Sequence, residues 1–289
     1  MKKSSPLEIL KRQIEILSLV EEFPSTFSKH DLCAKFNIEL ATVNRDLHSL
    51  RAQGFPLYSV KKKLVLEKAL TNSEHTKLLS MYLPISHDAV AYPKNLSLTT
   101  KKMGKRSLAT FVSLVKAIEK KREIEIEYYK MYDNETVTRQ LQPYVLFPQT
   151  REWMLIAKSG GMLKHFYVDN ILRLKLLDGK FVRDKNFDAQ KMYLNSWDIF
   201  QSSEPTIVRL LFSKEVSSLI QSKVWSETQT LDEQNDGSVL LTVRVSSPEE
   251  EMLGWIMSWG GDVEILAPME LKRLVKERAK AILLLRKEM

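Results

Sequence analysis

Residues 28–66 constrain the fold of this chain more than any other segment, because they hold a helix start, a tight turn, a helix end and a hairpin in one short run. Ser28, followed three residues later by Asp31, has the pattern of a capping box, so a short helix is expected to begin there. Asn37 tolerates the left-handed conformation that ends many helices, and Gly54 gives the same signal for a second helix. The segment therefore predicts two short helices joined by a turn.

The second of these helices is predicted to bury one stripe and to expose a polar face. Val43, Leu47 and Leu50 are spaced four and three residues apart, which places them on one side of a helix. An Arg side chain can form paired hydrogen bonds with guanine, an Asn can do so with adenine, and a Thr methyl can contact thymine. Residues off the buried stripe are therefore expected to contact DNA bases, and they are Thr42, Asn44, Arg45 and His48, with the small Ala41 permitting close approach.

A basic hairpin is predicted to follow. Short strands are expected over Leu57–Val60 and Leu64–Glu67. The residues expected to contact DNA phosphates are Lys61, Lys62 and Lys63 at the tip, together with Arg51. Two helices joined by a turn and followed by a basic hairpin are the plan of a winged helix-turn-helix that binds duplex DNA. The alternative is a solvated helical hairpin with ordinary surface lysines.

The run ELATVNRDLHSLRAQGFPLY resembles the winged helix of the DeoR-like bacterial transcription regulators. In that family a Thr, an apolar residue, an Arg-Asp-Leu and a later Leu mark the recognition helix. The matching residues here are Thr42, Val43, Arg45, Asp46, Leu47 and Leu50. The resemblance implies that residues 1–70 form a DNA-binding domain.

Length and composition limit what the rest of the chain can be. A chain of 289 residues is too long for one compact core and predicts two or three domains. The formal net charge of +8 favours a polyanionic partner, and the single cysteine excludes an intrachain disulfide and fits a reducing cytoplasm. No apolar run is long enough to cross a bilayer, and the N-terminal segment lacks the pattern of a signal peptide. We therefore expect a cytoplasmic protein with no membrane partner.

Residues 71–106 change in character. Pro84 and Pro93 interrupt the pattern, and the run KNLSLTTKKMGKRS is polar and basic without apolar periodicity. We expect a linker over residues 71–106 that leads to a helix over Leu108–Lys120. The basic residues of this linker either contact DNA phosphates or simply face water.

From Glu123 onward the pattern alternates as in a strand, with Ile124 and Ile126 on one face. Further strands are expected over Val137–Leu146, Glu152–Lys158, Leu163–Val168 and Ile171–Leu177. A helix followed by five short antiparallel strands fits a small SH3-like or Sm-like barrel.

The same region resembles the WYL domain, a family named for a Trp-Tyr-Leu tripeptide and found in bacterial regulators with N-terminal winged helices. The resemblance spans residues 107–195, and the predicted domain covers residues 107–200. It depends on the order of several motifs, namely Tyr128-Tyr129, Arg139 with Pro143, Trp153-Met154-Leu155, Phe166 and Asp169-Asn170-Ile171. The resemblance implies a domain that senses an effector. WYL-type regulators of this layout are also associated with phage-defence clusters, a link that depends on genomic context.

Three positions depart from the family pattern. Met154 replaces the central Tyr, Asn170 replaces an Arg, and His165 stands where another Arg is expected. In the family, such Tyr and Arg side chains line a basic pocket for nucleotide or nucleic-acid effectors. Met cannot donate a hydrogen bond and Asn cannot pair with phosphate as an Arg does, so a modified pocket is expected. Its candidate residues are Arg139, Tyr144, Lys164, His165 and Tyr167.

Residues 205–289 are predicted to form a separate α+β unit of sandwich-like architecture, which resembles the C-terminal extension found after WYL domains. Strands are expected over Ile207–Phe212, Val224–Leu231, Val239–Val245 and Val263–Leu266, and helices over Lys214–Lys223, from Pro248 to Trp259 and after Pro268. The final helix has a broad apolar stripe that either packs on its own sheet or pairs with a second subunit. We expect this unit to support a homodimer.

No constellation of catalytic residues stands out. The five histidines are scattered, without the paired spacing of a zinc-binding helix. The chain has no phosphate-binding P-loop, no dinucleotide fingerprint and no Gly-x-Ser-x-Gly motif. We therefore expect no catalytic site, no metal site and no cofactor.

Taken as a whole, the sequence predicts an α+β multidomain protein that binds double-stranded DNA. The leading hypothesis is a dimeric, sequence-specific bacterial transcription regulator that represses from an inverted repeat and is controlled by an effector at its WYL-like domain. Other hypotheses are an activator, a regulator that responds to single-stranded nucleic acid, or a nucleic-acid-binding accessory protein with no promoter target.

Overall fold

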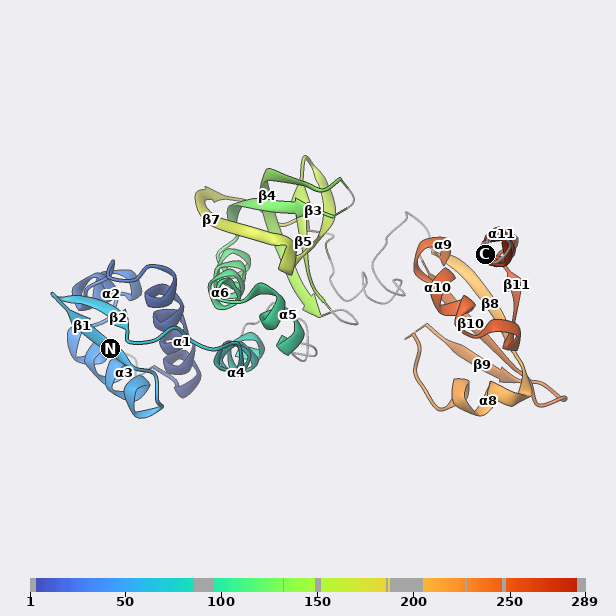
Figure 1. Cartoon of the computed structure of the whole chain (residues 1–289), viewed down its shortest axis with the longest axis horizontal. Coiled ribbons are helices and arrows are strands. Elements are labelled where there is room, and N and C mark those ends of the chain that lie inside the picture. The colour runs from blue at the N-terminus through green and yellow to red at the C-terminus, as the bar shows by residue number, and fades with distance from the viewer. Residues whose placement is uncertain are drawn as a thin grey trace. The chain divides into compact units, whose positions relative to one another are not determined.

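The computed structural model describes residues 4–85, 96–131, 133–148, 152–185, 187, 205–226, 228–245 and 248–284. The chain divides into two compact units, Met1–Asp184 and Lys185–Met289. Both units are of mixed helix and strand, with two sheets in the first and one in the second (Figure 1).

Three helices and a two-stranded hairpin begin the first unit: α1 (Pro6–Glu22), α2 (Lys29–Phe36), α3 (Leu40–Ala52), β1 (Leu57–Val60) and β2 (Lys63–Leu66) (Figure 1). Capping boxes fix the starts of α1 and α2, at Ser5 and Ser28. Asn37 ends α2 in the left-handed conformation, with φ 52° and ψ 53°, so the local signals predicted this helix correctly.

Helix α1 is the central element of this unit, because it contacts α3 and β2 as well as α4 and α6 (Figure 1). It buries polar as well as apolar residues. Glu15 is buried, accepts a hydrogen bond from Tyr82 Oη at 3.0 Å and pairs with Lys116 Nζ at 2.8 Å. One hydrophobic core runs from α1 and α3 through α6 into the larger sheet.

The segment expected to be a linker contains two helices, α4 (Asn72–Tyr82) and α5 (Leu96–Met103), with a short 3-10 turn, η1 (Leu83–Ile85), after α4. Residues 86–95, including Pro93, lie outside the described residues. Helix α5 buries Leu96, Thr99, Thr100 and Met103. This spacing is helical, but two of its four members are threonines, so a search for apolar periodicity passes over it.

Helix α6 (Arg106–Glu119) leads into an antiparallel sheet built from β3 (Arg122–Lys130), β4 (Glu135–Pro148), β5 (Trp153–Ser159), β6 (Met162–Tyr167) and β7 (Ile171–Lys180), with the short turn η2 (Val168–Asn170) before β7. The strand order is β6-β5-β4-β3-β7. Phe111 of α6 packs edge-on against Trp153, with ring centroids 5.3 Å apart. Helix α6 therefore covers the core of this sheet.

The five strands match the predicted segments, but the described residues form an open sheet where the sequence predicted a closed barrel. Strands β6 and β7 are its two edges. Strand β4 pairs with β3 through its first half and with β5 through its second half, and its register shifts between Pro143 and Val145. A proline there removes one backbone donor, and a bulge bends the strand without closing the sheet.

The second unit has a four-stranded antiparallel sheet of order β11-β8-β10-β9. Its elements are β8 (Thr206–Phe212), α8 (Lys214–Gln221), β9 (Thr230–Glu233), β10 (Val239–Val245), α9 (Pro248–Glu251), α10 (Leu253–Met257), η3 (Gly260–Asp262), β11 (Val263–Ala267) and α11 (Met269–Leu284) (Figure 1). Two details differ from expectation. The strand predicted over Val224–Leu231 begins only at Thr230, and the predicted helix from Pro248 to Trp259 is divided into α9 and α10.

An aromatic cluster explains the first of these differences. Trp225 packs against Trp255 and Trp259, with ring centroids 5.1 and 6.0 Å apart. Trp225 Nε1 also donates to the Ile220 carbonyl at 2.9 Å, which holds this segment against the end of α8. In the described part of the chain, no helix combines the length and the apolar character needed to span a membrane.

Candidate nucleic-acid interface

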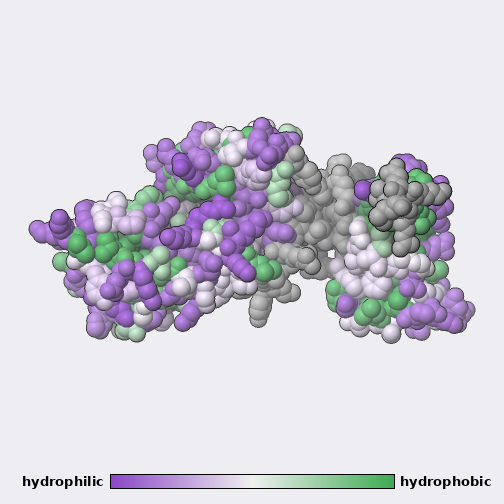
Figure 2. Space-filling view, viewed as in Figure 1, coloured by the Kyte–Doolittle hydropathy of each residue, from purple (hydrophilic) through white to green (hydrophobic). Residues whose placement is uncertain are grey.

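Helix α3 has one buried and one exposed side, as its spacing predicted. Val43, Leu47 and Leu50 are buried in the core. Of the candidate base-contacting residues, Asn44, Arg45 and His48 are exposed, as is Ala41, while Thr42 is half-buried. The visible surface of unit 1 is largely hydrophilic, with smaller hydrophobic patches (Figure 2).

Side chains on this exposed face hold one another in place. Arg45 donates from Nη2 to Thr42 Oγ1 at 3.1 Å and from Nε to the Ala41 carbonyl at 3.4 Å. Lys29, the first residue of α2, donates to Asn44 Oδ1 at 2.8 Å. The sequence did not single out Lys29, although its position next to the helix cap at Ser28 was a usable signal. Lys29 adds a positive charge next to Asn44.

Asp46 is turned away from this face. It is buried and accepts hydrogen bonds from Arg12 Nε at 2.6 Å, Arg12 Nη2 at 3.2 Å and Gln13 Nε2 at 3.2 Å. The acidic residue of the Arg-Asp-Leu pattern thus joins α3 to α1. Its role is to position α3 on the core.

The hairpin turn has an unusual backbone. Lys61 and Lys62 connect β1 to β2, and both have positive φ, 47° and 66°. A two-residue turn with both φ values positive favours Asn-Gly, since only small or specially adapted residues adopt this conformation at low cost. Both lysines are exposed. Two charged side chains therefore occupy a position that the backbone prefers to give to other residues.

The other two candidate phosphate-contacting residues make contacts within the protein. Lys63 belongs to β2 rather than to the tip, and its Nζ lies 2.8 Å from the Thr26 carbonyl and 3.2 Å from Asp31 Oδ2. Arg51 donates from Nε to the Leu57 carbonyl at 2.6 Å, which ties α3 to β1. Asp31 also accepts the Ser28 amide, and these contacts lower the pKa of Asp31 from 3.8 to about 2.

Comparisons with known proteins agree with this arrangement. Residues 109–176 match the WYL domain family, and residues 204–283 match the WCX domain family. Over 286 residues the chain is 22% identical to an uncharacterized HTH-type transcriptional regulator, YobV, of Bacillus subtilis strain 168, covering 86% of this chain and 90% of that protein. The chain belongs to the WYL-domain transcription regulators.

Two solved structures resemble this WYL-domain regulator. One is the proteasome accessory factor B/C (PafBC) of Arthrobacter aurescens, at 15% identity and a TM-score of 0.27 over 95% of this chain; the chain spans 48% of the length of that protein. The other is a CRISPR Cas-related protein, at 13% identity and a TM-score of 0.41, covering 98% of this chain and 88% of that protein.

The five residues predicted for an effector pocket of this WYL-domain regulator do not come together in one site. Lys164 and His165 are consecutive in β6, and consecutive strand residues point to opposite faces. The pairing of β5 with β6 sets His165 and Tyr167 opposite Ile156 and Met154 on one face, which leaves Lys164 on the other. Arg139 in β4 stands opposite the buried Ile126 of β3.

Tyr144 and His165 are also less accessible than the prediction required. Tyr144 is fully buried, and its ring stacks on Phe181 with centroids 5.6 Å apart. Its hydroxyl accepts the Asp184 amide at 3.3 Å, so Tyr144 is a core residue. Burial lowers the pKa of His165 below its ordinary value of 6.5, so the ring is neutral at pH 7 and supplies no charge for an anion.

The structure brings together a different set of cations, which the sequence analysis missed. They line a cavity where α1 and α2 face α6, β3 and β7, and they are Lys35, Lys116, Lys120 and Arg122. Lys35 is far from the other three in sequence, and no motif or periodicity connects them. Only the packing of α2 near the end of α6 makes them neighbours.

Proposed function

We propose that this WYL-domain regulator is a dimeric, sequence-specific repressor that binds an inverted repeat in double-stranded DNA. Residues 1–70 would form its winged helix-turn-helix, with α3 in the major groove and the β1–β2 hairpin along the phosphate backbone. The observation that supports this most directly is the two-sided character of α3. Its apolar side is buried, while Asn44, Arg45 and His48 are exposed on a helix that ends just before the hairpin.

In this proposal the exposed face of α3 supplies specificity and the hairpin supplies affinity. Thr42, Asn44, Arg45 and His48 would contact base edges, and Lys61 and Lys62 would contact phosphates. Lys63 and Arg51 already have partners within the protein, so their main part would be to hold the hairpin in position.

A dimer follows from the limited number of bases that one recognition helix can contact. Two such helices placed about 34 Å apart contact two half-sites one helical turn apart, which multiplies the discrimination between sequences. The exposed apolar end of α11 supports pairing through the second unit, since Ile282, Leu283 and Leu284 are all exposed. The protein would act by binding, with an effector controlling its affinity for DNA.

Nuclease footprinting of the DNA upstream of the protein's own gene tests this function. We expect a protected inverted repeat whose half-site centres are about 10 base pairs, or a multiple of that, apart. Deleting the gene should raise transcription from the protected promoter. A fall in transcription would instead support an activator, and binding without any protected repeat would support an accessory protein.

A further inference from the structure

A small cavity lies in unit 1 where helices of the DNA-binding region meet the larger sheet. It has a volume of about 240 Å³ and is lined by α1, α2, α6, β3 and β7. Of the described residues that line it, four are cations and Glu22 is the single carboxylate. Ser18 and Ser113 contribute hydroxyl groups to the same wall. Positive charge and hydroxyl donors in a cavity of this size fit a phosphate group.

The positive charge of the cavity is only partly neutralised. Lys116 pairs with Glu15 at 2.8 Å, and Arg122 pairs at 2.9 Å with Asp178, which is fully exposed to solvent. Within the part of the chain that the structure describes, Lys35 and Lys120 form no ion pair. Two ammonium groups are thus available to an anion.

Helix ends explain part of this cluster but not all of it. Lys116 and Lys120 lie at the C-terminal end of α6, where the helix dipole favours positive charge. Lys35 belongs to a different helix, and burial together with the charges of Lys116, Lys120 and Arg122 lowers the pKa of its ammonium group. Like charges held together against their repulsion suggest a missing anionic partner.

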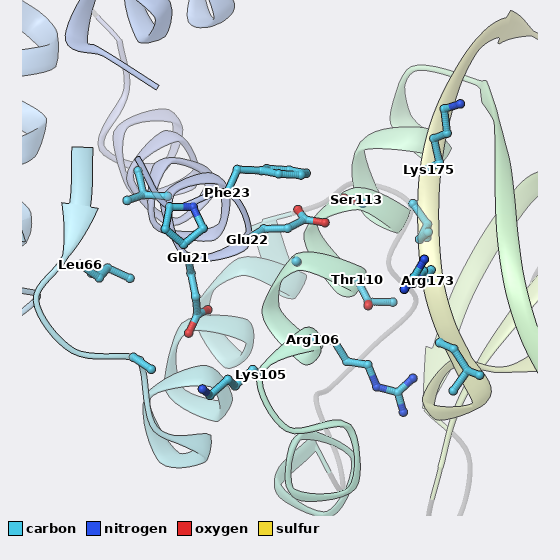
Figure 3. A pocket seen from close by; sticks show the side chains of 16 residues that line it. Glu21, Glu22, Phe23, Leu66, Lys105, Arg106, Thr110, Ser113, Arg173 and Lys175 are labelled. Atoms are coloured by element: carbon cyan, nitrogen blue, oxygen red, sulfur yellow. The ribbon is translucent and has the colours of Figure 1, made fainter. Parts of the chain in front are cut away.

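A larger cleft adjoins this cavity. Its volume is about 680 Å³, and it shares Glu22 and Ser113 with the smaller cavity. Figure 3 shows Phe23, which follows α1, on one side of the cleft and Arg173 on β7 on the other. Phe23 is 45% exposed, so its ring is accessible for stacking. The cleft is of the size that holds a small organic ligand.

We propose that this junction binds a phosphate ester that carries a planar ring, with the phosphate at Lys35, Lys120 and Arg122 and the ring in the larger cleft beside Phe23. Free nucleotides and the phosphorylated ends of single strands both have this chemistry. None of these residues belongs to the pocket that the family resemblance predicted.

The position of the site gives it a regulatory consequence, and this part rests on the proposed function. One wall consists of α1 and α2, which carry the DNA-binding region, and the other consists of α6, β3 and β7. A ligand that contacts both walls stabilises one arrangement of the two. If that arrangement differs in its affinity for DNA, the ligand changes DNA binding by the same factor by which DNA changes ligand binding.

Thermal unfolding of the full chain tests the phosphate site without DNA. Inorganic phosphate should raise the Tm more than chloride at equal ionic strength. In Lys35→Gln/Lys120→Gln the affinity for phosphate should fall roughly tenfold or more, since charged hydrogen bonds are lost. Without phosphate this variant should be at least as stable as the wild type, because like-charge repulsion is removed. The matched control is Lys121→Gln, which removes a neighbouring exposed charge outside the cavity and should bind phosphate normally.

Calorimetric titration tests the ring. Adenosine 5′-monophosphate should bind more tightly than inorganic phosphate or adenosine, and Phe23→Ala should remove that advantage while leaving phosphate binding unchanged. A 5′-phosphorylated oligothymidylate, compared with its unphosphorylated form, shows whether a strand end binds more tightly than the free nucleotide. Equal binding of phosphate by the wild type and the double variant overturns the site, and equal binding of phosphate and the nucleotide overturns the ring cleft. A protein that binds the nucleotide but protects no DNA keeps this site and loses the proposed repressor function.

Discussion

Arg45 is the residue on which specificity most depends in the proposed complex, because its guanidinium is exposed and held only by Thr42 and a backbone carbonyl. Arg45→Ala should weaken binding to a cognate site by about 1–3 kcal/mol and relax the base preference at one position. Arg45→Lys is the informative comparison, since it keeps the charge but loses the paired hydrogen bonds to guanine. Fluorescence anisotropy on cognate and scrambled duplexes measures both effects. Unchanged cognate affinity in Arg45→Ala would remove this residue from the interface.

Asp46, its neighbour, should behave in the opposite way. The Asp46 and Arg12 side chains are 4% and 10% exposed, so removing one leaves the other charged and buried. Asp46→Ala should lower the free energy of unfolding by about 3–5 kcal/mol, measured by urea denaturation. The double variant Arg12→Met/Asp46→Leu should recover much of that loss, because a buried ion pair can be replaced by apolar residues at little cost. A stable Asp46→Ala protein with weakened DNA binding would mean that Asp46 acts at the interface.

At the scale of elements, the hairpin turn separates stability from binding. Replacing Lys61 and Lys62 with Asn and Gly suits the positive φ of both positions, so the variant should unfold at a higher urea concentration than the wild type. The same change removes two candidate phosphate contacts. It should therefore weaken all duplexes alike and reduce the slope of log K against log salt by about 2. An unchanged slope would show that the turn does not contact phosphate.

The start of α2 should give the protein a specific acid sensitivity. Asp31 accepts the Ser28 amide and pairs with Lys63, and these contacts lower its pKa from 3.8 to about 2. A carboxyl group with a lowered pKa stabilises the fold above its ordinary pKa and loses that contribution as the pH falls through the lowered value. The free energy of unfolding should therefore fall more steeply between pH 3.8 and about 2 in the wild type than in Asp31→Asn. Parallel curves for the two proteins would contradict this assignment.

Local signals predicted most of these elements, and the errors have physical causes. The Ser28 cap, the Asn37 helix end and the alternation from Glu123 are properties of neighbouring residues, so the sequence contains them directly. Helix α5 was missed because Thr99 and Thr100 occupy its buried face. The effector pocket was assembled from residue types without regard to the alternation of strand faces. The cation cluster depends on which helices pack together, which no local pattern encodes.

At the scale of the first unit, polar contacts through α1 join the DNA-binding region to the rest. His75 of α4 is fully buried, with Nε2 2.8 Å from Glu21 Oε2 of α1 and Nδ1 2.8 Å from Ser107 Oγ of α6. Glu15 of α1 has similar contacts with Tyr82 and Lys116. Buried polar groups need their partners, so α1 cannot shift relative to α4 and α6 without exchanging these contacts. Any effector signal that reaches α3 therefore has a defined set of contacts to change.

The second unit bears on whether two copies of the chain act together. In α11, Leu271 packs in the core, whereas Ile282, Leu283 and Leu284 are 54%, 68% and 62% exposed. Such an apolar helix end is costly in water and suits burial against a second copy. Ile282→Asp/Leu283→Asp should convert a dimer of twice 33.5 kDa into a monomer by light scattering. It should also weaken binding to an inverted repeat far more than to a single half-site.

The control for this change is Lys280→Glu, which alters the charge on the same helix at an exposed position without touching the apolar group. It should leave the mass at that of a dimer. A wild-type protein that is monomeric at micromolar concentration, with and without DNA, would contradict the dimer directly. A variant that stays dimeric but is otherwise folded would place the interface elsewhere. In that case the exposed end of α11 would need another partner, because its three consecutive apolar residues have no other account in this fold.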